Sequence, residues 1–163
     1  MTLVLGSGRT ASGPDRVTLD ADARLSPDVV CTLGKDPLPF ADDHFDAATA
    51  VHVLEHIGKQ GETSEWFQFW EELYRVLKPS GLLAIEAPLY SSVWAWADPT
   101  HVRALSPEAF AFFDQDNYRI AGSSISPYRV RCDFTPARPY ERVGEHFRGA
   151  LTARKPLRPW WES

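Results

Sequence analysis

One stretch of about twenty residues, LPFADDHFDAATAVHVLEHI at 38–57, constrains the fold of this chain most strongly. Its first residues, LPFADDH, predict a turn. The run Phe45–Val51 is short and apolar, which is typical of a buried strand. Three polar side chains, His52, Glu55 and His56, follow that strand at once. Because ligands bind beyond the C-terminal ends of the strands in an open parallel sheet, this stretch predicts where a functional site would lie.

The N-terminal residues predict a glycine turn between two strands. Leu3–Leu5 is a short apolar strand that runs directly into Gly6-Ser7-Gly8. Such a turn lets a ligand approach the backbone and leaves N–H groups free to donate, although glycines in an ordinary tight turn have the same pattern. The next strand, Arg16–Leu19, ends at Asp20, whose carboxylate can accept hydrogen bonds from a ribose diol.

The connection between these two strands is short. Eleven residues separate Gly8 from Asp20, whereas about 20 are usual in dinucleotide-binding folds because a full helix lies between. Residues 10–15 have room for a loop or one turn. The sequence therefore predicts an abbreviated first crossover with no helix N-terminus for a pyrophosphate, which argues against a dinucleotide and for a ligand without a diphosphate.

Further patterns predict two helices and the rest of the sheet. Ser64–Lys78 carries apolar residues at spacings of three and four and is predicted to be a helix with Ser64 as its N-cap. Ser106-Pro107-Glu108 predicts the start of another helix, which ends near Phe113. The alternating segment Tyr128–Phe134 predicts a half-exposed strand. The other predicted strands are Val29–Leu33, Leu82–Ala87 and Phe147–Ala153, the last of which also suits a helix.

Length and charge limit the classes of partner. The chain has 163 residues, enough for one domain with a sizeable core, and a net charge of −5, which argues against a general nucleic-acid binder. Residues 1–128 carry 9 Lys and Arg against 18 Asp and Glu, whereas residues 129–163 carry 8 against 4. We interpret this basic C-terminal segment, 129–163, as a solvated face, with a docking surface for an acidic partner as the alternative.

Cysteine usage and hydropathy indicate the compartment. Cys31 and Cys132 lie in apolar runs and are predicted to be buried free thiols, and the sequence holds no C-x-x-C metal pattern. The N-terminus enters a strand without a basic region, and no run approaches the ~18–20 apolar residues of a membrane span. We therefore expect a cytoplasmic protein with no membrane partner.

Four ordered motifs together resemble a known family. They are VLGSG, VTLDAD, LPFADDHFDAATAVHVLEHI and ELYRVLKPSGLLAIEAP, and the segment DPTHVRALSPEAF adds to them. This set resembles the class I S-adenosylmethionine-dependent methyltransferases, in particular their short type-11 branch. The resemblance covers roughly residues 2–113 and implies an α/β fold with a Rossmann-like open twisted sheet, mostly parallel with a C-terminal antiparallel strand. It also implies S-adenosylmethionine as the cofactor.

The resemblance implies roles for the residues that match the family's motifs. The turn Gly6-Ser7-Gly8 would lie against the methionine part of the cofactor, and Asp20 would hold the ribose hydroxyls. Thr32 and Leu33 fall where the family lines the adenine, and many members carry an acid where this chain has Thr32. Ala50 and His52, at the end of the fourth strand, would flank the amino-acid end of the cofactor. The departure at Thr32 puts the affinity for the cofactor in doubt.

In this fold the loop after the fifth strand would lie over the cofactor, so the resemblance makes His101 and Asp98 candidate catalytic bases, with His52 a third. The alternative for each is a structural role in fixing the loop. Glu55 and His56 are interpreted as helix-start and packing groups. A metal site formed by His52, His56, Asp98 and His101 is conceivable because zinc and iron accept such N and O ligands, but we predict no metal.

The acceptor of the methyl group is open, and three functions fit the sequence. The first is methyl transfer to a small-molecule or sugar-like acceptor, for which Trp94, Trp96, Trp160 and Trp161 could form an apolar wall, although packing is the alternative use of these side chains. The second is a degenerate, non-catalytic binding protein. The third is methylation of a macromolecule docked on the basic C-terminal segment. A nucleic-acid partner is disfavoured, and an exposed sheet edge makes a homodimer plausible.

Overall fold

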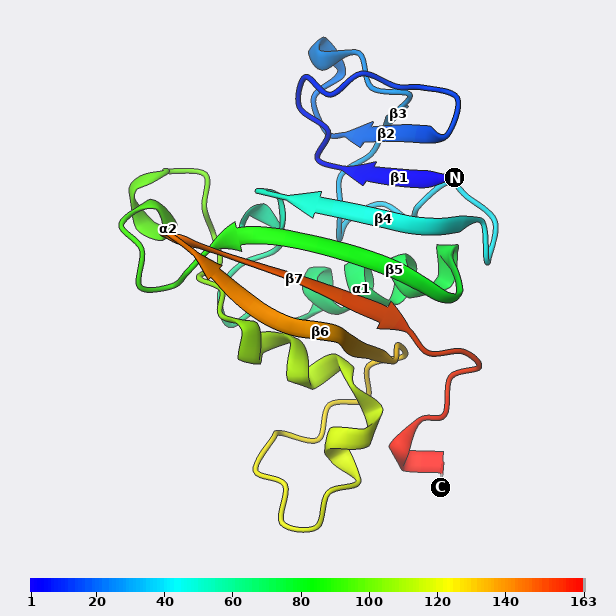
Figure 1. The fold of residues 1–163 in the computed structure, drawn as a ribbon, viewed down its shortest axis with the longest axis vertical. Helices are drawn as coiled ribbons and strands as arrows, with labels where there is room; N and C mark the ends of the chain where they lie inside the picture. Colours follow the sequence, from blue (N-terminus) through cyan, green and yellow to red (C-terminus); the bar gives the residue numbers. More distant parts are fainter. Residues whose placement is uncertain (163) are drawn as a thin grey trace.

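The computed structural model describes residues 1–162 and contains a seven-stranded sheet of order β3-β2-β1-β4-β5-β7-β6 (Figure 1). The strands are β1 Thr2–Leu5, β2 Arg16–Asp20, β3 Val29–Val30, β4 Phe45–Val51, β5 Leu77–Pro88, β6 Phe134–Val143 and β7 His146–Ala153. The α-helices are α1 Ser64–Val76 and α2 Trp94–Ala97. The 3₁₀ helices are η1 Ala23–Leu25, η2 Leu54–His56, η3 Pro107–Phe113, η4 Gln115–Tyr118 and η5 Trp160–Glu162.

Four of the strand pairings in the sheet are parallel, and the two pairings made by β7 are antiparallel. β1 pairs with β2 and β4, β2 pairs with β3, and β4 pairs with β5, all in parallel. β7 then runs antiparallel to β5 and carries β6 on its other side. This is the mostly parallel, Rossmann-like sheet that the motifs predict, with β7 as the C-terminal strand that runs opposite to the others. None of the described helices is long and apolar enough to cross a membrane.

The first crossover contains no helix, as the short spacing predicts. Residues 6–15 connect β1 to β2 through turns, irregular loop and an isolated bridge between Gly13 and Arg16. Backbone hydrogen bonds hold the connection at both ends, from Thr2 N to Asp15 O at 2.8 Å and from Ser7 N to Leu19 O at 2.9 Å. The glycine turn is therefore fixed directly against the end of β2.

Helix α1 packs its apolar side into an aromatic core. Trp66, Phe69, Trp70 and Leu73 are all buried, and the Trp70 ring stacks on Phe113 of η3 with centroids 4.4 Å apart. Such spacing of apolar residues is what makes a helix amphipathic, and burying each large aromatic side chain contributes about 1.5–3 kcal/mol. These contacts hold α1 and η3 together against the sheet.

One face of the sheet is covered and the other is open. Figure 1 shows α1 behind the sheet and none of the described helices in front of the central strands. Along β5, Leu83 is completely buried whereas its neighbour Leu82 is 45% exposed, and Val51 at the end of β4 is 50% exposed. Parallel sheets are normally covered on both faces, so this open face is a departure from the usual arrangement.

Two predicted boundaries around α1 are wrong. The helix ends at Val76 instead of Lys78, because Lys78 precedes a proline, which disfavours helical backbone, and Leu77 already pairs with Phe45 of β4. Ser64 is not the N-cap: Thr63 occupies that position without a side-chain cap bond, and the Glu62 carboxylate instead accepts from the Ser64 amide and hydroxyl.

Three other predicted elements differ from the structure. The strand predicted at Val29–Leu33 is limited to Val29–Val30, and the helix predicted from Ser106 to Phe113 is a 3₁₀ helix without a Ser106 side-chain cap. The strand predicted at Tyr128–Phe134 is wrong up to residue 133, because the Gln115 side-chain amide binds the carbonyls of Val130 and Cys132. The segment Phe147–Ala153 is a strand, and Cys31 and Cys132 are buried free thiols, as predicted.

Candidate functional site

A cavity lies where the strand order reverses, between the C-terminal ends of β1 and β4. It has a volume of about 300 Å³, and ligands in open α/β sheets bind at such reversal points. The side chains and backbone that line it are Gly6, Leu19, Asp20, Ala21, Cys31, Thr32, Leu33, His52, Val53, His56 and Ile57. Five of the eight residues predicted to contact a cofactor line this cavity: Gly6, Asp20, Thr32, Leu33 and His52.

The glycine turn approaches this cavity closely and holds Asp20 in place. Gly6 has φ +57°, and a Cβ added there would lie 2.4 Å from Cγ2 of Val53, so the position requires glycine. Gly8 has φ +55° and open space on its Cα. The Gly8 amide donates to Oδ2 of Asp20 at 2.8 Å, and the Asp22 amide donates to Oδ1 at 2.9 Å. Asp20 is therefore oriented by backbone donors.

The remaining predicted cofactor residues lie outside the lining of this cavity. Ser7 is buried, its hydroxyl makes no hydrogen bond to a described residue, and it borders a second hollow. That hollow is about 750 Å³, and it lies under the helix-free first crossover on the open side of β1 and β4. Ala50 is completely buried in the core. The larger hollow contains none of Asp20, Thr32 or His52, so we place the candidate site in the smaller cavity.

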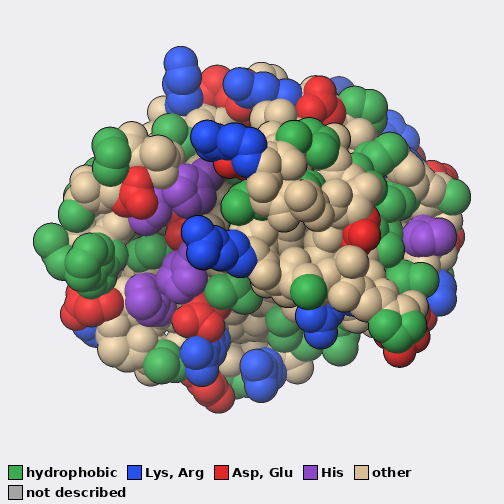
Figure 2. Space-filling model, turned by 90° about the horizontal axis from the view of Figure 1, so that it is seen from above, with side chains coloured by type: hydrophobic (Ala, Val, Ile, Leu, Met, Phe, Trp, Pro, Cys, Tyr) green, Lys and Arg blue, Asp and Glu red, His purple; other side chains and the backbone are tan. Residues whose placement is uncertain are grey.

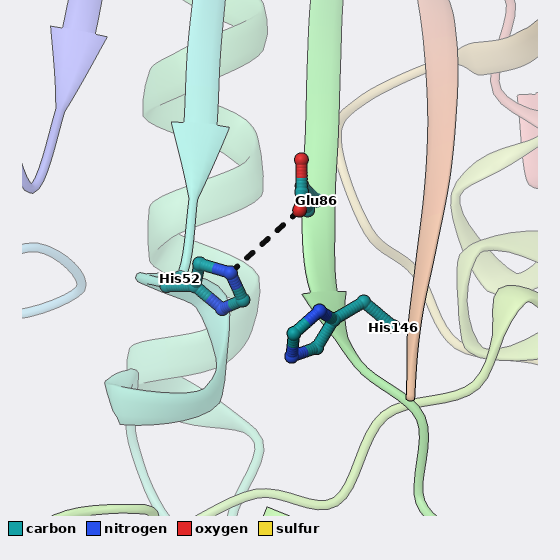
Figure 3. Close-up of side chains that lie close together, drawn as sticks. All are labelled: His52, Glu86 and His146. Carbon is teal, nitrogen blue, oxygen red and sulfur yellow. Dashed lines mark ion pairs between the residues drawn. The ribbon is translucent and has the colours of Figure 1, made fainter. Parts of the chain in front are cut away.

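His52 lies at the turn after β4 and belongs to a cluster on the open side of the sheet (Figure 3). It has φ +51°, an uncommon conformation for a residue other than glycine. Its Nε2 lies 3.8 Å from Oε1 of Glu86 on β5, and its ring is 4.7 Å from that of His146 at the start of β7. Arg148 donates to Glu86 at 2.7 Å and lowers the pKa of that carboxyl. The Glu86 carboxylate is therefore already paired with a cation.

A second cluster gathers around the buried carboxylate of Glu55, a residue interpreted from the sequence as a helix-start and packing group. Glu55 is 2% exposed, and neither carboxylate oxygen makes a hydrogen bond to a described residue. Its Oε1 lies 3.4 Å from Nδ1 of His52 and 3.9 Å from Nε2 of His101. Figure 2 shows histidine side chains gathered in two groups toward one end of the molecule, with another histidine at the far end.

The loop after β5 brings two of the predicted catalytic residues to this second cluster. The His101 side chain is 9% exposed, and its Nε2 lies 3.9 Å from Oδ2 of Asp98. Asp98 is exposed and accepts from the Thr100 amide and hydroxyl, which lowers its pKa. The His101 ring also lies edge-on to the ring of His56, at 4.7 Å. His52 and His56 do not share a helix face, because His52 precedes η2 and each contacts a different histidine.

The four tryptophans proposed for an apolar wall do not lie together. Trp94 and Trp96 belong to α2, at the opposite side of the molecule from the C-terminal end of the chain in Figure 1. Trp160 and Trp161 belong to η5, where Trp160 stacks on Tyr118. The idea of one wall built from all four side chains is therefore wrong.

The basic C-terminal segment, 129–163, is partly neutralised within the molecule. Arg154 pairs with Asp114, Asp116 and Asp133, Arg148 pairs with Glu86, and Lys155 pairs with Asp43. Three of the eight basic residues of this segment are thus bound to carboxylates of the same chain. These pairs reduce the positive charge that this segment presents to a partner.

Part of the chain matches a known protein family. A family model described as a methyltransferase domain matches residues 14–85, which run from the first crossover through most of β5. The sheet order and the position of the cavity agree with that match. Over these 72 of its 163 residues the chain is similar to a methyltransferase domain. A comparison with curated proteins gave no match to the sequence.

Solved structures share the fold of this chain at low sequence identity. A SAM-dependent methyltransferase from Archaeoglobus fulgidus is 14% identical, with 93% of this chain and 85% of that chain covered and a TM-score of 0.60. The 1,6-didemethyltoxoflavin-N1-methyltransferase of Burkholderia thailandensis was solved with 1,6-didemethyltoxoflavin and S-adenosylhomocysteine. It is 15% identical, with 94% of this chain and 71% of that chain covered and a TM-score of 0.57. The [4+2]-cyclase SpnF is 19% identical, with 96% of this chain and 74% of that chain covered and a TM-score of 0.56. At these identities the likeness concerns the fold.

Proposed function

We propose that this chain transfers the methyl group of S-adenosylmethionine to a small-molecule or sugar-like acceptor. The observation that carries the proposal is the cavity at the β1/β4 reversal point, which combines a glycine turn, an oriented carboxylate and apolar walls. The methyltransferase-domain match supports the same cofactor. The Burkholderia relative, whose structure contains a small molecule and S-adenosylhomocysteine, supports this class of acceptor.

The residues at the cavity fit such a cofactor. Each oxygen of Asp20 accepts one backbone N–H, so lone pairs remain for the two hydroxyls of a ribose. Leu33 and Ile57 offer apolar contacts to a purine ring, beside the exposed Thr32. The open space at Gly8 leaves room for the methionine part, where a side chain would obstruct it. When bound, S-adenosylmethionine supplies the electrophilic methyl group.

We propose His52 as the base that takes a proton from the acceptor. His52 lines the cavity and its Nδ1 lies 3.4 Å from Glu55, whose carboxylate would stabilise the protonated imidazole. His101 lies 3.9 Å from the same oxygen but does not line the cavity, so the geometry favours His52 as the base and His101 as a positioning residue. Asp98 is exposed and hydrogen-bonded to Thr100, which suits a role in shaping the loop.

The two alternatives are weaker but testable. The internal ion pairs of Arg148, Arg154 and Lys155 argue against a macromolecule docked on the basic C-terminal segment. A protein of this fold without methyl transfer remains a candidate, because the fold is also that of a [4+2]-cyclase. Cofactor binding without methyl release to any class of acceptor would favour that alternative.

The first experiment is isothermal titration of the purified chain with S-adenosylmethionine and S-adenosylhomocysteine. We expect micromolar binding that Asp20→Ala weakens by more than about tenfold, which is roughly 1.4 kcal/mol. Asp46→Ala is the matched control, because Asp46 lies at the opposite, N-terminal end of β4 and pairs with Lys78. A folded wild-type chain that binds neither compound would refute the proposal, and equal losses in the two variants would move the site elsewhere.

A further inference from the structure

We propose that Glu55, His56 and His101 form a binding site for a divalent transition-metal ion of the zinc class. The three ligand atoms all lie within 4.8 Å of one another. Around a tetrahedral zinc with bonds of about 2.0–2.1 Å, ligand atoms are roughly 3.3 Å apart, so small side-chain rotations would bring this set into place. The inference goes beyond the proposed methyl transfer, because it concerns a second ligand.

The first argument is the state of Glu55. A carboxylate that is 2% exposed has lost its hydration, and both oxygens of Glu55 lack a hydrogen bond to any residue between 1 and 162. The ring nitrogens Nδ1 of His52 and Nε2 of His101 lie 3.4 and 3.9 Å from Oε1, longer than a normal hydrogen bond. Buried charges are normally paired or coordinate a metal. A cation bound among these side chains would therefore offset the free-energy cost of burying the Glu55 carboxylate.

The second argument is the orientation of His56. Its Nδ1 lies 3.1 Å from the carbonyl oxygen of Thr100. A carbonyl oxygen accepts only, so Nδ1 carries the proton and the lone pair of the neutral ring is on Nε2. Histidines that bind metals characteristically donate their other ring N–H to a backbone carbonyl in this way, which fixes both the tautomer and the ring orientation.

The third argument is the composition and place of the set. Two imidazoles and one carboxylate are a ligand set that zinc and iron accept, and three protein ligands leave one position for water or an acceptor oxygen. His56 also lines the candidate cofactor cavity. An ion held here would therefore border the candidate cofactor cavity.

The neighbouring cluster of His52, Glu86 and His146 has similar spacing but is a poorer site. Arg148 already occupies the Glu86 carboxylate at 2.7 Å, and its positive charge would repel a metal cation. The His52 and Glu86 side chains are also more exposed, at 41% and 20%. The two clusters therefore provide matched variants for a test.

The test is titration of tag-free, chelator-treated protein with zinc chloride, with metal content measured after dialysis. We expect one ion per chain, and we expect Glu55→Gln, His56→Gln and His101→Gln each to weaken binding by at least about tenfold. His146→Gln, from the other cluster, and His44→Gln, from neither, should bind as the wild type does. Circular dichroism checks that each variant folds, and three separate ligand variants keep the test decisive if one does not.

Two outcomes would overturn the inference. One is a folded wild-type chain that binds no zinc at a one-to-one ratio. The other is zinc binding that survives Glu55→Gln and His101→Gln, or that His146→Gln abolishes. Titration of Glu55→Gln with S-adenosylhomocysteine separates this inference from the proposed function, because the variant should keep cofactor binding while it loses the metal.

Discussion

At the scale of single residues, the two glycines of the turn, Gly6 and Gly8, should differ in how strongly an alanine destabilises the fold. Gly6 and Gly8 both have φ near +55°, but only Gly6 faces a side chain, that of Val53. Left-handed backbone costs a non-glycine residue roughly 1–2 kcal/mol, and overpacking adds about 1–3 kcal/mol. Gly6→Ala should therefore lower the free energy of unfolding by about 2–5 kcal/mol and Gly8→Ala by only about 1–2 kcal/mol. Urea unfolding measures both, and equal losses would contradict the close contact with Val53.

The sequence predicts the position of some cavity-lining residues because that position is fixed locally. Gly6 and Asp20 follow strands directly, so the strand pattern alone places them at the mouth of the sheet. The burial of the Glu55 carboxylate could not be predicted in this way. Its burial depends on the chain that returns after β5, where the Val102 and Arg103 amides bind the Glu55 carbonyl oxygen. A contact across nearly fifty residues leaves no periodic signal in the sequence.

At the scale of elements, the two faces of β5 differ in what they contribute to stability. Leu83 is completely buried and Leu82 is 45% exposed, although the residues are adjacent. Leu83→Ala should cost about 2–5 kcal/mol of unfolding free energy because it leaves a cavity. Leu82→Ala should cost less than about 1 kcal/mol, since its side chain is already partly in water. Chemical denaturation of the pair checks this, and a large loss for Leu82→Ala would mean that something covers the open face.

The turn before β4 is fixed to α1 by Arg75, which gives the protein a component of acid sensitivity. Arg75 donates to Glu72 and Asp42 and to the carbonyls of Leu38 and Phe40. The bond from Arg75 lowers the pKa of Glu72 below its ordinary value. The ionised carboxylate therefore stabilises the folded state above the unfolded pKa of about 4.3, and this contribution is lost as the pH falls through the lower folded value.

Glu72→Gln should accordingly destabilise the chain at pH 7 and have a smaller effect near pH 3. Urea unfolding at the two pH values measures the difference. Glu145→Gln, at an exposed carboxylate in the β6–β7 turn, is the control and should change neither value appreciably. A penalty for Glu72→Gln that is the same at both pH values would show that the pair with Arg75 does not contribute to acid sensitivity.

At the scale of the whole molecule, Arg154 joins parts of the chain that are distant in sequence. It follows β7 and pairs with Asp114 at the N-cap of η4, with Asp116 within η4, and with Asp133 before β6. Asp133 is only 2% exposed, so removal of its partner would leave a buried charge. Arg154→Ala should lower the unfolding free energy by about 3–5 kcal/mol. Arg138→Ala, on the exposed part of β6, is the control, and similar losses in both would contradict this role.

The sequence predicts the architecture better than it predicts the C-terminal details. The motifs up to β5 place the parallel strands and the helix-free crossover because each strand has its own apolar run. The segment before β6 was wrongly predicted as a strand because a buried glutamine side chain, Gln115, takes the place of a neighbouring strand. A tertiary contact of this kind overrides a local alternation of side chains.

The short first crossover also bears on how quickly the sheet can assemble. Thr2 pairs with Arg16, 14 residues away, on one side and with Ala47, 45 residues away, on the other. Because the entropy of loop closure grows with the logarithm of the separation, the first pairing costs roughly 1 kcal/mol less to close than the second. A parallel strand pair, normally a slow, long-range contact, thus becomes a local one in this chain. The rate of folding should then be set by the arrival of β4 at a β1–β2 pair that can form early.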